Sequence, residues 1–113
     1  MAIIYKGIGW TKTPIGECKD GTIYKGIGWS NKAIGEYENG VIYKGIGWSK
    51  TPIGEYKDGT VYSGIGWSKT VVGTYKNGIV FEGVGFFGSN PIGEYDEEPA
   101  GAATLLLFQG ELL

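Results

Sequence analysis

A chain of 113 residues is long enough for one domain and too short for two. Ten lysines against twelve acidic residues give a net charge of −2, which argues against nucleic acid as the main partner because phosphate binding needs surplus basic charge. A lone cysteine excludes an internal disulfide, and the first residues lack the features of a signal peptide. We therefore expect a cytoplasmic location by default.

One 19-residue unit recurs along most of the chain. It is marked by an aromatic residue at constant spacing (29 − 10 = 19, and so on): Trp10, Trp29, Trp48, Trp67 and Phe86. The five copies span residues 2–20, 21–39, 40–58, 59–77 and 78–97, the last with one extra residue. We predict a repeat region over residues 1–97, followed by a separate tail at 98–113.

Each copy is predicted to form two strands. In the third copy, residues 41–48 are rich in β-branched and aromatic side chains, and a second strand at 53–57 follows a turn-like segment. The copies are joined by pairs that favour two-residue hairpin turns, in which both central residues have positive φ: Asp20-Gly21, Asn39-Gly40, Asp58-Gly59 and Asn77-Gly78. The sequence thus predicts an all-β fold in which tandem β-hairpins form an antiparallel meander of ten strands.

A parallel β-solenoid with one copy per coil is the alternative. It would stack Lys6, Lys25 and Lys44 about 4.8 Å apart, whereas a meander separates them by about 9.5 Å. Charge repulsion and turn chemistry both favour the meander. Strict alternation would place two sets of residues on opposite faces, with Tyr43, Gly45 and Gly47 on one and Ile42, Lys44, Ile46 and Trp48 on the other. Which face is buried stays open.

The tail leaves the repeat pattern. Its apolar stretch, residues 102–108, is far shorter than the roughly 20 residues of a membrane-spanning helix, so we expect no integral membrane span. We expect the tail to cap the repeats, by covering an open end or by pairing with an edge strand.

No pattern of catalytic or metal-binding residues stands out. Histidine is absent, the glycine-rich Lys-Gly-Ile-Gly-Trp segment lacks the remainder of a phosphate-binding motif, and the repeated glutamates would share near-identical environments. The aspartates between copies are explained by their turns. We predict a protein that is not an enzyme and that uses no cofactor and no metal.

The repeated aromatic residues are the candidate ligand-binding residues: Trp10, Trp29, Trp48, Trp67 and Phe86. If exposed, they form a regular row beside lysines, suited to stacking on sugar rings or to holding a cationic ligand such as choline. If buried, they are core. The sequence favours burial, because four exposed tryptophans would form a sizeable apolar patch.

The repeat resembles known modules. The order Gly47-Trp48, Tyr56, Asp58-Gly59 resembles the choline-binding or cell-wall-binding repeats of Gram-positive surface proteins, in which aromatic residues of hairpins bind choline or wall polymers. Residues 54–59 are also similar to the MORN repeat, a hairpin module for membrane or protein contact. The Tyr-Lys/Ser-Gly-Ile-Gly-Trp repeats with a leucine-rich tail look most like an uncharacterised bacterial tandem-repeat family.

The sequence therefore predicts a structural or ligand-binding repeat protein, with carbohydrate or choline as the ligand. The alternative is a scaffold that associates with itself as a homo-oligomer through its edge strands or a flat Tyr and Gly face.

Overall fold

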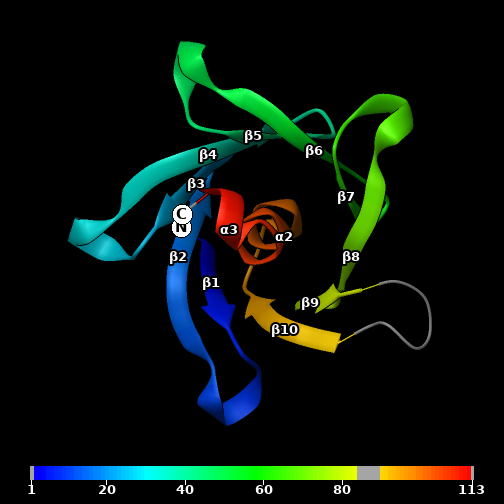
Figure 1. Ribbon diagram of the computed structural model, residues 1–113. Helices are drawn as coiled ribbons and strands as arrows, with labels where there is room; N and C mark the ends of the chain where they lie inside the picture. Colours follow the sequence, from blue (N-terminus) through cyan, green and yellow to red (C-terminus); the bar gives the residue numbers. More distant parts are fainter. Residues whose placement is uncertain (1, 84–89, 113) are drawn as a thin grey trace.

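The chain folds into a closed antiparallel barrel with its C-terminal helices in the interior (Figure 1). The computed structural model describes residues 2–83 and 90–112. Consecutive strands pair around the ring, and β1 closes it by pairing with β10. The elements are β1 (Ala2–Lys6), β2 (Thr13–Lys19), β3 (Thr22–Lys25), β4 (Lys32–Glu38), β5 (Val41–Lys44), β6 (Thr51–Lys57), β7 (Thr60–Ser63), β8 (Thr70–Lys76), β9 (Ile79–Glu82), β10 (Asn90–Tyr95), α2 (Pro99–Leu107) and α3 (Gln109–Leu112). The all-β meander is confirmed, and the parallel solenoid is excluded.

The predicted turns join the repeats. Asp20, Asn39, Asp58 and Asn77 all have φ near 50°, and the glycine after each has φ near 83°. Because L-residues other than Asn and Asp seldom adopt such angles, the local sequence fixes these four hairpin connections.

The other hairpin connections depart from the prediction that residues 41–48 form one strand. β5 ends at Lys44, and Gly45 and Gly47 then adopt φ of 86° and 66°. The chain leaves the sheet there and forms a short 3₁₀ helix, Gly47–Ser49. The alternation proposed for residues 45–48 was therefore wrong, because alternation holds only while the backbone stays extended.

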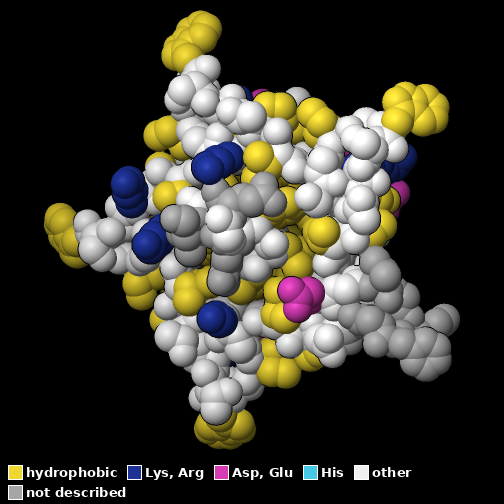
Figure 2. Space-filling model, viewed as in Figure 1, with side chains coloured by type: hydrophobic (Ala, Val, Ile, Leu, Met, Phe, Trp, Pro, Cys, Tyr) yellow, Lys and Arg dark blue, Asp and Glu magenta, His cyan; other side chains and the backbone are white. Residues whose placement is uncertain are grey.

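Within the described residues, four such projections, here called arms, radiate from the barrel: residues 7–12, 26–31, 45–50 and 64–69. The molecule is a flat disc of 39 × 38 × 21 Å, and the arms give it the outline of a star (Figure 2).

The core lies between the strands and α2. One fully buried β-branched side chain from each repeat points into the barrel: Ile4, Ile23, Ile42, Val61 and Val80. Residues 101–106 of α2 are also buried, and Figure 1 shows α2 at the centre of the ring. The question of the buried face is thus settled: the face of Ile42 is inside.

A ring of glycines lets the helices approach the strands. An added Cβ on Gly16, Gly35, Gly54, Gly73 or Gly93 would lie 2.3–2.8 Å from a carbonyl oxygen of the neighbouring strand and 2.6–3.2 Å from an apolar side chain of the tail. Since real Cβ atoms do not come that close, glycine is required wherever the tail packs against an even-numbered strand.

The start of the tail is anchored at the hairpin-turn end of the barrel. Glu98 adopts a left-handed conformation (φ 54°), its carboxylate accepts a hydrogen bond from the Tyr37 hydroxyl, and its carbonyl oxygen is 3.9 Å from Cys18 Sγ. Burial raises the pKa of the Cys18 thiol to about 12, which keeps it protonated and unreactive. The tail was expected to cover an open end or to pair with an edge strand, but the closed barrel places it in the interior.

Among residues 2–83 and 90–112, neither helix has the length and apolar character that are needed to span a membrane.

Gly54→Ala tests the fit between barrel and helix. The new methyl group would lie 2.4 Å from the Tyr62 carbonyl oxygen and 2.8 Å from the Phe108 ring, so we expect destabilisation by about 1–3 kcal/mol, measured by urea unfolding. Gly110→Ala is the matched control, because nothing lies within 4 Å of its Cβ and alanine favours the helix. Equal stability of the two variants would contradict the proposed packing.

Candidate functional site

The tryptophans lie at the outer ends of the arms and are exposed to solvent. Trp10, Trp29, Trp48 and Trp67 have relative exposures of 104–106%, so each side chain is as open as in an extended peptide. The expectation that they are buried was wrong, because the arms carry them away from the barrel. Phe86, the fifth candidate, lies outside the described residues.

Local hydrogen bonds shape each tip. In the third arm, the Lys50 backbone N–H donates to the Gly47 carbonyl oxygen and the Ser49 hydroxyl donates to the Ile46 carbonyl oxygen. Ile46 is 45% exposed beside Trp48. Each tip therefore presents a fully exposed indole and a partly exposed isoleucine side chain on a compact turn.

Each arm is held by the preceding repeat, in an arrangement here called the clasp. Glu36 Oε2 accepts a hydrogen bond from the Gly47 backbone N–H at 2.8 Å, and Glu36 Oε1 pairs with Lys50 Nζ at 2.9 Å. The same ammonium group lies 4.5 Å from the centre of the Tyr43 ring. At the base of the arm, the Gly45 N–H donates to the carbonyl oxygen of Ile34, the extra residue of a β-bulge.

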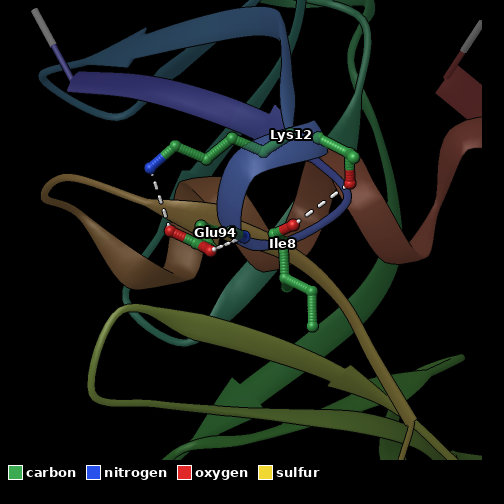
Figure 3. A network of polar contacts seen from close by, with 5 residues as sticks. Ile8, Lys12 and Glu94 are labelled. Carbon is green, nitrogen blue, oxygen red and sulfur yellow. Dashed lines mark hydrogen bonds and ion pairs between the residues drawn. The ribbon is translucent and has the colours of Figure 1, made fainter.

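The clasp recurs around the ring. Glu55 binds Gly66 and Lys69 in the same way, and Glu94 binds Gly9 and Lys12, joining the fifth repeat to the first (Figure 3). Glu17 also accepts from the Gly28 N–H, at 2.6 Å, but the second arm has Asn31 at the lysine position. The repeated glutamate thus has a structural role, which was not evident from its position in the sequence.

Hydrogen bonding sets the charge state of these carboxylates. The backbone N–H of Gly47, followed by the Lys50 ammonium, holds the pKa of Glu36 below its ordinary value of 4.5. The equivalent glycine and lysine lower the pKa values of Glu55 and Glu94. At neutral pH, the carboxylates of Glu36, Glu55 and Glu94 are therefore ionised, and the clasps that they form are intact.

A surface depression lies beside the tryptophan of the fourth arm. It has a volume of about 470 Å³ and is lined by Tyr62, Gly66, Trp67 and Lys69. An indole, a tyrosine side chain and a lysine side chain thus border one space large enough for a small polar ligand.

A second cleft, of about 450 Å³, opens between β7, β8 and β9 and is lined by Asp58, Gly59, Thr60, Thr74, Tyr75, Lys76 and Phe81. Thr74 stands where the other repeats have the clasp glutamate, and Phe81 stands where they have tyrosine. Both replacements lie in the lining of this cleft.

Within residues 2–83 and 90–112, no group of three or more Asp, Glu, Cys or His side chains is arranged to hold a metal ion. Comparisons with protein-family models, curated proteins and solved structures find no match to the chain.

Acid should loosen the clasps. Because the folded-state pKa values of Glu36, Glu55 and Glu94 are depressed, the stability that they contribute is present above pH 4.5 and is lost as the pH falls through the folded values. We expect the urea concentration at the unfolding midpoint of the wild type to decrease as the pH is lowered from 5 to 3. A triple Glu→Gln variant at these positions should start less stable at pH 7 and lose less on acidification.

Glu38→Gln is the control, because Glu38 is exposed on β4 and belongs to none of the clasps. Its acid response should follow the wild type. If the urea midpoint of the triple variant decreased on acidification as much as that of the wild type, the clasps would not stabilise the arms.

Proposed function

We propose that the protein is a non-enzymatic, multivalent carbohydrate-binding module whose contact points are the tips of the arms. The main support is the exposure of the four tryptophans, which contribute nothing to the core. A large apolar side chain that gains no stability from burial is a candidate for contact with a partner. The clasps hold each tip in place, which lowers the entropic cost of binding.

Carbohydrate suits the chemistry of a tip. An indole face packs against the apolar C–H face of a sugar ring, and nearby polar groups can bond its hydroxyls. Beside Trp67, the polar side chains of Tyr62 and Lys69 line the same depression. A single sugar would find one aromatic platform and two polar side chains.

The same geometry favours sugars over choline. A quaternary ammonium ligand is held best in a cage of several free aromatic faces, and each tip offers one free face, that of its indole. Here the faces of Tyr5, Tyr43 and Tyr62 lie 4.5–4.8 Å from the ammonium groups of the protein's own Lys12, Lys50 and Lys69. A second cation would be repelled from these rings, whereas a neutral or anionic ligand would not.

The arrangement of the arms suits a polymer better than a free sugar. In the described part of the chain, four similar tips project from one disc, so a chain or surface with repeated sugars can engage several tips together. Linked contacts can raise the overall affinity by about 10²–10⁴ over a single contact. Multivalency would therefore compensate for weak binding at each open tip.

Self-association is the alternative function. Every described strand is paired on both sides in the closed barrel, so edge-to-edge pairing has no free edge. The exposed tips remain available for contact between copies, which a concentration-dependent molecular mass would reveal.

Replacing Trp10, Trp29, Trp48 and Trp67 by alanine tests the proposal. Because the side chains are exposed, each replacement should change the free energy of unfolding by less than about 0.5 kcal/mol. Binding to insoluble polysaccharides (cellulose, chitin, bacterial cell walls), measured by pull-down, should weaken with each tryptophan removed. Soluble oligosaccharides should shift the tryptophan emission of the wild type.

The Trp→Phe series is the matched control, since phenylalanine keeps an aromatic platform and should retain part of the binding. Choline chloride should leave the emission unchanged. If the fourfold alanine variant binds the same polymers as the wild type, the tips are not the contact points.

A further inference from the structure

Lysines gather around one mouth of the barrel. Lys6, Lys25 and Lys44 follow the buried Ile4, Ile23 and Ile42 by two residues, so alternation turns them to the inward side of the sheet. All three are nevertheless exposed, because the strands end there and the barrel opens to solvent. Lys32 joins them from β4. These four residues are called the basic arc.

Two members of the arc face each other directly. Lys25 on β3 pairs with Lys32 on β4 in the antiparallel register, and both are exposed. Like charges directly opposite each other destabilise a strand pair. The equivalent pairs in the first, third and fourth repeats contain threonine at the second position, so the fold itself does not require a lysine there.

The arc covers only part of the mouth. The fourth and fifth repeats have Ser63 and Glu82 at the position of Lys6, Lys25 and Lys44. Figure 2 shows lysine side chains gathered over the region of β1, β3, β4 and β5, with an acidic side chain near β9 and β10. The asymmetry extends to the whole chain, because residues 1–77 have a net charge of +4 (ten lysines, six acids) and residues 78–113 have six acids and no lysine.

A purely structural account explains only part of the arc. α2 begins at the hairpin-turn end of the barrel, where Glu98 contacts Tyr37 and Cys18, so the negative end of α2 points toward the opposite mouth, where the arc lies. One or two cations would complement that helix end. The direct pairing of Lys25 with Lys32 adds repulsion that the helix does not require, and an anionic partner would remove it.

The arc and the tips belong to the same stretches of chain. Lys6 and Lys44 immediately precede the first and third arms, and Lys25 and Lys32 flank the second arm. A polymer bound to Trp10, Trp29 or Trp48 can therefore also contact the lysines at the base of the same arm. Resting on the proposed function, we infer that the ligand is an anionic polysaccharide, whose sugar rings stack on the tryptophans while its carboxylate or phosphate groups bind the basic arc.

Two matched polymers test this inference: carboxymethyl-cellulose, which is anionic, and hydroxyethyl-cellulose, which is neutral. At low salt, the wild type should bind the anionic polymer at least about tenfold more tightly, and added salt should remove the preference. A Lys25→Gln, Lys32→Gln, Lys44→Gln variant should bind both polymers alike. The fourfold Trp→Ala variant should lose binding to both. Melting temperatures verify that each variant is folded.

The charge-matched control is Lys19→Gln, Lys57→Gln, Lys76→Gln, which removes three exposed lysines from the ends of β2, β6 and β8 and should keep the preference. Equal wild-type affinity for the two polymers, with loss in the Trp→Ala variant, would overturn the anionic assignment and leave the proposed function standing. A preference that survives the Trp→Ala changes would overturn the proposed function. Equal or tighter binding to polyglutamate, single-stranded DNA or phosphatidylglycerol vesicles would also overturn the glycan assignment.

Discussion

The contact between the C-terminal helix and the glycines of the even-numbered strands determines the rest of the structure. A ring of ten strands has an interior that must be filled, and a repeat with one buried β-branched residue and one glycine per two strands cannot fill it alone. α2 supplies the missing volume with alanines and leucines. Because the interior is filled from the tail, the repeats are free to use their large aromatic residues elsewhere.

That division explains the exposed tryptophans. In folded proteins, tryptophan is highly buried on average, and aromatic side chains contribute much of the apolar area of a core. Here the arms carry them beyond the barrel, and the clasps between repeats hold the arms without using apolar burial. The glutamate, glycine, lysine and tyrosine of the clasp contact one another, so the arm is held without any contribution from the indole. Stability and binding therefore depend on separate residues of one repeat.

Much of the fold was predictable from the sequence, because the decisive signals are local. The Asp-Gly and Asn-Gly pairs set four turns, and the 19-residue spacing set the hairpin repeat. Closure of the ring was not predictable, since it depends on pairing between Ile4 and Tyr95, at opposite ends of the chain. The positions of the tryptophans were predicted, but their exposure was not, because Gly45 and Gly47 fit a bent strand or an arm equally well by composition. Only the positive φ angles decide between the two.

The fit of the helix within the ring also bears on how such a protein can evolve. Tandem repeats commonly gain or lose copies by duplication and deletion, and an open solenoid tolerates this because its length is unrestricted. In a closed barrel, the diameter grows with the number of strands. An added hairpin would loosen the ring around α2, and a lost one would leave it no room. The tail that fills the ring thus restricts the number of repeats, and a family built on this plan would have to change its tail whenever it changed its number of arms.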